Sequence, residues 1–225
     1  IDLLRQALER APDDPMILAA YALAVARRLS FGGTDDDLAE ARAVSARALR
    51  LAPDRPEPHI ALASIAMHVA DHVEAARALG DALQLAPHHV DAHHLRGLLT
   101  LEVVGPAEGL AHLYTAMTID PTLTHVRWWI GRGHAVLGEW ERSDAIFAEA
   151  TYDDQGANDY WVNRTRTLLY GRTPERESRF LAELAAAPAF DMKPAISVVM
   201  ALLRGEPAPL TALAVLANPN RSLSR

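Results

Sequence analysis

Histidines at helical spacing are the side chains of this sequence most suited to chemistry. His68 and His72 are four residues apart, as are His89 and His93, so each pair would lie on one face of a helix. Two such imidazoles and a third ligand can bind zinc. His88 and His94 lie beside the second pair in the sequence and cluster with Asp91. The Glu of a metalloprotease helix is missing between the paired histidines, and His89 is expected in a loop. We therefore predict no metal site, and keep a structural or adventitious ion near Asp91 as the alternative.

The other reactive groups do not form a catalytic constellation. The carboxylates of Asp35–Asp37 resemble a metal-binding cluster, but an acidic helix start or a solvated loop explains them more simply. Thr34 or one of these acids is expected to cap that helix. No Gly-rich phosphate loop follows a strand pattern. We therefore predict that this chain is not an enzyme and that it holds no cofactor.

Composition and charge narrow the classes of partner. The chain contains no cysteine, which excludes disulfides and thiolate metal sites and fits a reducing, cytoplasmic location. Its net charge is −7, and residues 1–155 carry 23 acidic but only 13 basic side chains. Because phosphate neutralisation dominates nucleic-acid binding, we expect no nucleic-acid partner. No apolar run is long enough to span a membrane, so we expect no membrane partner either.

Five arginines gather in a short stretch of the second half of the chain. We expect them mostly on a solvated helix face, with an acidic partner or the acidic body of the chain as alternative contacts. They are Arg164, Arg166, Arg172, Arg176 and Arg179.

The helices that position these residues can be predicted from a pattern that repeats every 34 residues. Pro53, Pro87 and Pro121 are spaced by 34 residues, and each closes a similar phrase such as Leu-Ala-Pro. A period of this length is typical of a repeat built from two helices. Small residues recur in phase at Ala63, Gly97 and Gly131, and the large residues Leu79, Leu113 and Phe147 recur at a second matched position. The small positions are expected where paired helices approach closely.

This pattern resembles the tetratricopeptide repeat. Repeat four is the nearest match, with Ile130-Gly131, the turn Leu137–Trp140 and then Ser143, Phe147 and Ala150. The resemblance implies an all-α, right-handed α-solenoid of about five to six helix–turn–helix units with a C-terminal capping pair of helices. His59, His93 and Arg127 occupy the fourth repeat position, where the family favours Trp.

The predicted organisation has five parts. They are residues 1–14 as the closing half of a truncated repeat; 15–157 as four repeats (15–55, 56–89, 90–123 and 124–157); 158–189 as a degenerate fifth repeat; 190–217 as capping helices, of which the last spans Leu210–Ala217; and 218–225 as a tail. In the fifth repeat, the first helix is expected to end at Gly171 and the second to begin at Pro174. Because the chain begins mid-helix at Ile1 without a Met, we expect a fragment of a longer bacterial protein.

The resemblance also implies a partner-binding groove on the concave face, lined by the first helix of each pair. The predicted groove residues are Leu23, Arg27, Ile60, Ser64, Met67, His68, His94, Leu98, Leu101, Trp128 and Arg132. This lining is mainly apolar, which suits an amphipathic helix or a hydrophobic peptide. A clamp for a terminal carboxylate is disfavoured, because only Arg27 and Arg132 are suitable cations. Of Trp128 and Trp129, one ring is expected inside and the other towards the groove.

These observations predict a protein–protein interaction module or scaffold that binds a protein or peptide partner. One alternative for the groove is that its residues pack on each other or on the chain's own C-terminal helices. One alternative for the function is a regulatory or substrate-positioning region of a larger bacterial enzyme or regulator, such as a Ser/Thr kinase, a transcriptional activator, or a glycosyl- or sulfotransferase. All of these alternatives share the same repeat pattern, and a fold does not determine which ligand it binds.

Overall fold

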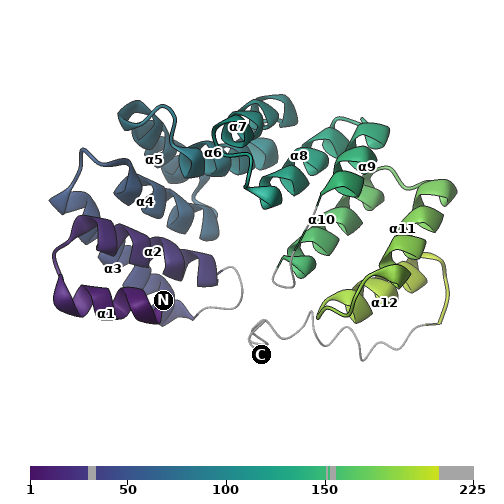
Figure 1. Ribbon diagram of the computed structural model, residues 1–225, viewed down its shortest axis with the longest axis horizontal. Coiled ribbons are helices and arrows are strands. Elements are labelled where there is room, and N and C mark those ends of the chain that lie inside the picture. The colour runs from purple at the N-terminus through teal and green to yellow at the C-terminus, as the bar shows by residue number, and fades with distance from the viewer. Residues whose placement is uncertain (30–33, 151, 153–155, 208–225) are drawn as a thin grey trace. The chain divides into compact units, whose positions relative to one another are not determined.

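A computed structural model describes residues 1–29, 34–150, 152 and 156–207. These residues form twelve α-helices and no strand (Figure 1), which confirms the predicted all-α class. The helices are α1 (Asp2–Arg10), α2 (Pro15–Leu29), α3 (Asp35–Leu51), α4 (Pro56–His68), α5 (His72–Leu85), α6 (Val90–Val103), α7 (Pro106–Ile119), α8 (Thr124–Val136), α9 (Trp140–Glu149), α10 (Ala157–Tyr170), α11 (Pro174–Ala186) and α12 (Lys193–Leu203). None of the described helices is long and apolar enough to cross a bilayer.

The periodic prolines mark helix ends. α3, α5 and α7 each end two residues before one of these prolines, at Leu51, Leu85 and Ile119. A proline two residues beyond the last helical turn cannot continue the helix, because its ring clashes with the preceding turn. The 34-residue spacing of the prolines therefore reflects the regular spacing of the helix ends.

Local side-chain chemistry sets the helix starts. Thr34 accepts a hydrogen bond from the Asp37 backbone N–H, and the Asp37 carboxylate accepts one from the Thr34 N–H. This reciprocal capping box begins α3, so the predicted cap at Thr34 is confirmed. α10 ends at Tyr170 with Gly171 as its C-cap, and α11 begins at Pro174, both as predicted.

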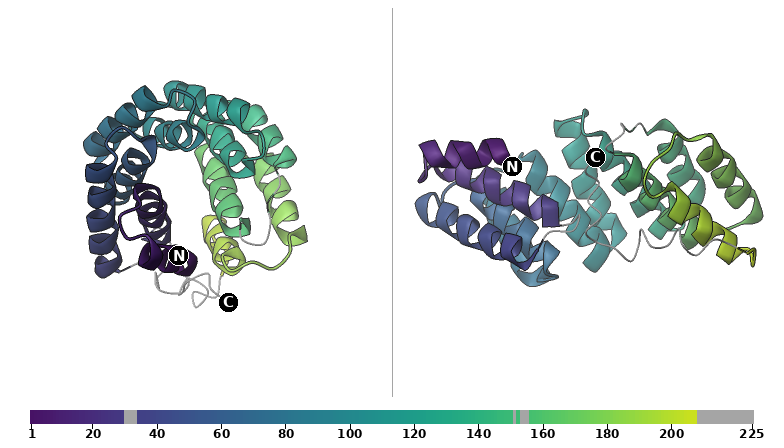
Figure 2. Two further views of the ribbon diagram at one scale, coloured as in Figure 1. Left: turned by 60° about the vertical axis from the view of Figure 1, so that its left-hand side comes forward. Right: turned by 90° about the horizontal axis from the view of Figure 1, so that it is seen from below.

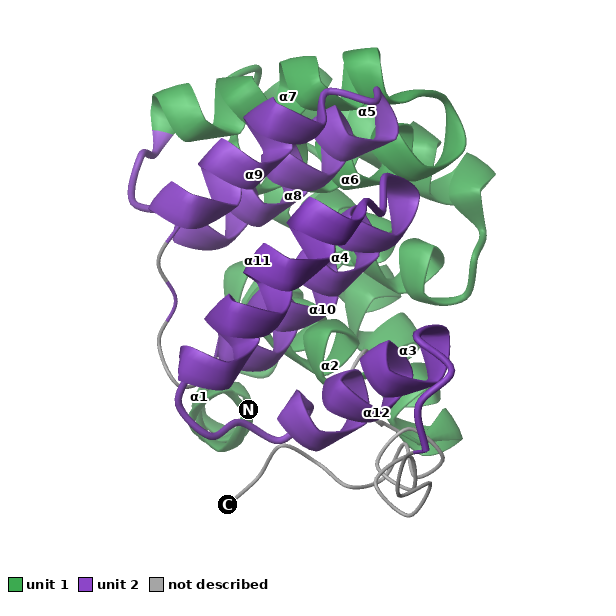
Figure 3. Ribbon diagram, turned by 90° about the vertical axis from the view of Figure 1, so that its right-hand side faces the viewer, with its two compact units in different colours: residues 1–119 green, residues 120–225 purple. Residues whose placement is uncertain are grey.

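The chain divides into two compact units, Ile1–Ile119 and Asp120–Arg225 (Figure 3). In unit 1, α2 contacts α4 and α4 contacts α6, while α3, α5 and α7 each pair with the helix that precedes them (Figure 2). We call α2, α4 and α6 the A helices of unit 1. The small periodic residues lie where the pairs meet, since a Cβ at Gly97 would lie 2.7 Å from Leu113 Cγ.

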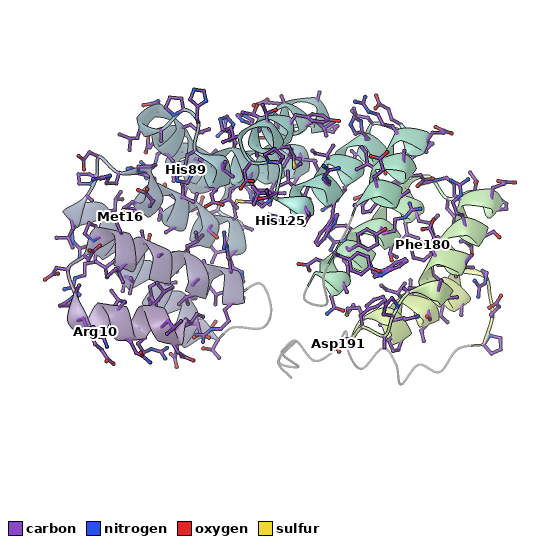
Figure 4. All side chains as sticks on the ribbon, in the orientation of Figure 1. Arg10, Met16, His89, His125, Phe180 and Asp191 are labelled. Atoms are coloured by element: carbon purple, nitrogen blue, oxygen red, sulfur yellow. The ribbon has the colours of Figure 1, made fainter. Side chains whose placement is uncertain are left out.

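Unit 2 has an aromatic core. Trp128, Phe147, Tyr160, Trp161 and Phe180 are all buried in one cluster that joins α8 to α11, and α12 adds Ile196 and Met200. The rings meet mostly edge to face, as between Tyr160 and Trp161 at 5.3 Å and between Trp161 and Phe180 at 5.7 Å. Figure 4 labels Phe180 among these side chains.

α12 coincides with the first of the two predicted capping helices. The predicted second helix, Leu210–Ala217, and the predicted tail at 218–225 lie outside the described residues. The repeat boundaries stay a prediction.

Candidate functional site

A depression opens on unit 1 between its A helices, with a volume of about 290 Å³. We call it the unit 1 groove. Its lining residues are Leu23 and Arg27 from α2, Ser64, Met67 and His68 from α4, and Asp91, His94, Leu95 and Leu98 from α6. Spacings of three, four and seven residues place each helix's contribution on one face. Seven of the eleven side chains predicted for a partner groove are thus brought together here.

The groove has an apolar floor and a charged rim. Leu23, Met67 and Leu98 are half-buried, so part of each side chain still meets solvent. On the rim, Arg27 Nη2 lies 3.8 Å from Asp91 Oδ1, with 65% and 41% of these side chains exposed. A salt bridge this exposed is screened by water and holds its partners weakly. The arrangement presents apolar side chains to solvent, with both signs of charge at its edge.

Two predicted groove residues lie inside unit 1 instead. Ile60 is 2% exposed and packs with Ala82 and Ala92. Leu101 is 6% exposed, and its backbone lies against Gly109 of α7. The prediction that these two side chains face a ligand is wrong, because both positions are occupied by contacts between the helices of a pair or of neighbouring pairs.

The last two predicted residues belong to unit 2, and the structure exchanges the roles of the adjacent tryptophans. Trp128 is 4% exposed and meets Tyr160 edge to face at 6.0 Å, so it is a core residue rather than a groove residue. Trp129 is half-buried, and the guanidinium of Arg132 lies 5.1 Å from its ring centroid. Arg132 itself is only 6% exposed. A cation held in this way against an indole is not presented to a ligand carboxylate.

Comparison with solved structures identifies the architecture. No protein-family model and no curated protein matches the sequence. The structure resembles YrrB, described as a tetratricopeptide-repeat protein with an unusual peptide-binding site, at 20% identity and a TM-score of 0.56 over 90% of this chain and 97% of that one. It resembles a tetratricopeptide-repeat protein of Parabacteroides merdae at 14% identity and a TM-score of 0.66, over 99% and 85%.

A third neighbour is PilW, a type IV pilus biogenesis factor, with 18% identity and a TM-score of 0.59 over 90% of this chain and 93% of that one. The fold is that of the tetratricopeptide repeat. The predicted helical-repeat solenoid is therefore confirmed.

Two histidines replace the aromatic residue that the tetratricopeptide repeat favours at its fourth position. His59 Nε2 lies 2.9 Å from the carbonyl oxygen of Pro53, and His93 Nε2 lies 2.9 Å from that of Pro87. His59 and His93 are 34 residues apart, as are Pro53 and Pro87. The same hydrogen bond therefore recurs in two successive repeats. Each histidine thus ties an A helix to the end of the preceding repeat.

The histidines that suggested a metal site diverge. His94 lines the unit 1 groove, whereas His93 on the same helix lies 3.0 Å, Nδ1 to Nδ1, from His112 on α7. His88 is exposed in the loop before α6. Among the residues that the structure describes, no three His, Cys, Asp or Glu side chains stand close enough to hold a metal ion.

Two of the five arginines expected on a solvated face are buried. Arg164 Nη1 lies 2.5 Å from Asp144 Oδ1, and Arg176 donates through Nε to Asp144 Oδ2 at 2.9 Å. Exposure is 3% for Arg164, 9% for Arg176 and 8% for Asp144. Burial alone raises the pKa of Asp144, but the hydrogen bonds from Arg176 and Arg164 outweigh it and lower that pKa. The expected solvated face was wrong for these two arginines, whose acid lies 20 and 32 residues away in the sequence. The alternative, contact with the acidic body of the chain, is confirmed for them, since Asp144 lies within residues 1–155. Arg166, Arg172 and Arg179 are exposed as expected.

Proposed function

We propose that this chain is a non-catalytic protein-interaction module whose unit 1 groove holds an apolar segment of a partner protein. One observation carries the proposal, namely the partly exposed apolar side chains that α2, α4 and α6 contribute to the groove. Fully burying a Leu or Met side chain contributes about 1.5–3 kcal/mol, so completing the burial of several such residues supplies useful affinity. The peptide-binding site described for YrrB supports a peptide as the class of partner.

The chemistry of the rim favours an apolar peptide over a terminal carboxylate. Arg27 already has Asp91 as a counter-ion, and Arg132 lies in the other unit under Trp129. A ligand carboxylate would therefore compete with the Asp91 carboxylate for the Arg27 guanidinium. An apolar anchor faces no such competition, and it removes water from Leu23, Met67 and Leu98.

A displayed library of random peptides, selected against the full chain, tests this proposal. Affinities of the selected peptides are then measured for wild type, for Leu98→Glu and for the matched control Val73→Glu. Leu98 is half-buried in the groove, whereas Val73 is 83% exposed on α5 and lies outside the groove lining. A carboxylate at position 98 must be desolvated when an apolar side chain binds.

We expect the selected peptides to carry clustered apolar residues and to bind Leu98→Glu at least about tenfold more weakly, which corresponds to about 1.4 kcal/mol. Val73→Glu should bind them as wild type does. Equal affinity for wild type and Leu98→Glu, with both variants folded by circular dichroism, would contradict the groove as the binding site.

A further inference from the structure

The contact between His93 and His112 joins the two helices of one pair in unit 1. His93 lies on α6, the A helix that supplies four residues to the unit 1 groove, and His112 lies on α7. Their Nδ1 atoms are 3.0 Å apart, and their ring centroids are 5.2 Å apart. This centroid distance is about the nitrogen separation plus one ring radius at each end. The two nitrogens therefore point at each other, as in a linear N–H···N hydrogen bond, rather than converging on a third atom.

The other nitrogen of His93 fixes which partner donates. His93 Nε2 lies 2.9 Å from the carbonyl oxygen of Pro87, which can only accept, so Nε2 carries a hydrogen. In a neutral ring this leaves Nδ1 of His93 as an acceptor. His112 must then donate from its own Nδ1. The neutral pair is thus fully matched, with one N–H between the two rings.

We propose that His93 and His112 form a proton-responsive latch, which holds α6 to α7 when the pair carries at most one positive charge and releases them when both rings are protonated. One added proton is tolerated, because an imidazolium still faces a neutral ring and the linear hydrogen bond survives. With two added protons, both Nδ1 atoms carry hydrogens, and two N–H groups cannot face each other at 3.0 Å. Two adjacent positive charges also repel.

The surroundings of the latch oppose the second proton. Burial is the main factor that lowers the pKa of His112, followed by the charges of His93 and Arg96 on α6, while Glu108 on α7 acts in the opposite direction. The charged groups that shift the pKa of His112 thus come from α6 and α7, the two helices that the contact joins. Pro87, at the end of the preceding repeat, presents only its carbonyl to His93.

The sign of the pH effect follows from the lowered pKa of His112. Between that pKa and the ordinary value near 6.5, the unfolded chain binds more protons than the folded one. Stability therefore falls as the pH falls through this window, and the loss is complete below the folded pKa. It is fully regained above the ordinary value.

Urea unfolding of the full chain at pH 7.5 and pH 5.5 tests the latch, with one signal for each unit. All four tryptophans (Trp128, Trp129, Trp140 and Trp161) lie in unit 2, so their fluorescence reports on unit 2 while far-ultraviolet circular dichroism reports on all helices. The variants are His112→Asn, whose amide can still donate to His93 but does not titrate, and the control His72→Asn at an exposed position of α5.

We expect the circular-dichroism midpoint of wild type to fall between pH 7.5 and 5.5, and His112→Asn to lose at least half of that fall. His72→Asn should behave as wild type. The same pH-dependent fall in His112→Asn as in wild type would overturn the proposal.

A second measurement keeps the test decisive if His112→Asn folds poorly. Proton resonances of the imidazole rings give the titration of His112 in wild type and in His93→Gln. Because the charge of His93 lowers the pKa of His112, replacing His93 by Gln should move the His112 titration upward. A wild-type His112 that titrates at or above the ordinary value, or that ignores His93→Gln, would refute the latch. Neither experiment uses a ligand, so neither result depends on the function proposed for the groove.

Discussion

Replacing Gly by Ala should have opposite effects on the stability of unit 1, depending on how closely the helices pack at the site. The substitution should stabilise at Gly80 and destabilise at Gly97 and Gly109. Gly80, Gly97 and Gly109 all lie inside helices, and none needs a left-handed backbone. A Cβ at Gly80 would meet nothing within 4 Å. At Gly97 it would lie 2.7 Å from Cγ and 2.8 Å from Cδ2 of Leu113. At Gly109 it would lie 2.7 Å from the backbone nitrogen and 2.8 Å from the Cα of Leu101.

The expected magnitudes follow from these distances. Replacing a helical Gly by Ala contributes about 0.5–1 kcal/mol, because the unfolded chain loses freedom, so Gly80→Ala should stabilise by that amount. At Gly97, overpacking costs about 1–3 kcal/mol and outweighs this gain, although the Leu113 side chain can shift. At Gly109 the obstacle is backbone, which cannot rotate away. Gly109→Ala should therefore be the most destabilising, by about 2 kcal/mol or more.

Urea unfolding followed by circular dichroism measures this order, and tryptophan fluorescence of unit 2 shows whether the effect stays in unit 1. We expect the midpoint to rise for Gly80→Ala, to fall for Gly97→Ala and to fall furthest for Gly109→Ala. A neutral Gly109→Ala, or a Gly80→Ala as harmful as Gly97→Ala, would refute the helix pairing described above.

Three further substitutions test local features of the structure. Ala70→Gly should stabilise the chain by about 1 kcal/mol in urea unfolding, because Ala70 has a φ of 59° where repeat four has Gly138 at 80°. Asp144→Ala should lower the free energy of unfolding of unit 2, followed by tryptophan fluorescence, by about 3–5 kcal/mol, since two buried guanidinium groups lose their shared acid. Because the pKa of Asp144 is lowered, its contribution is present above the ordinary carboxyl pKa near 4 and is lost only as the pH falls further. Thr34→Ala should cost about 1 kcal/mol by removing the cap of α3, whereas an unchanged midpoint would contradict the capping box.

Much of the fold was predictable from the sequence, because the same signals for helix ends and for helix contacts recur in successive repeats. The 34-residue spacing of Pro53, Pro87 and Pro121 anticipated where α3, α5 and α7 end. The small residue at Gly97 and the large one at Leu113 anticipated a close helix contact. Each of these features recurs in neighbouring repeats, so its meaning does not depend on one residue.

Features that occur once were predicted poorly. The period does not say which of two adjacent tryptophans points inward, and packing against Tyr160 placed Trp128 there. The partner of His93 was not found, because position 112 corresponds to Ala78 one repeat earlier and so carries no periodic signal. The one sequence signal was His93 itself, a polar residue at the fourth repeat position, where the tetratricopeptide repeat favours an aromatic residue.

A titration of the methionine methyl groups tests the central claim, that the unit 1 groove holds the partner segment. The chain has five methionines, of which Met67 lines the groove and Met200 is fully buried in the core of unit 2. With methyl-labelled methionine and a peptide from the selection above, we expect the Met67 signal to shift in a saturable manner while the Met200 signal stays in place. A peptide that binds without moving the Met67 signal would contradict the claim.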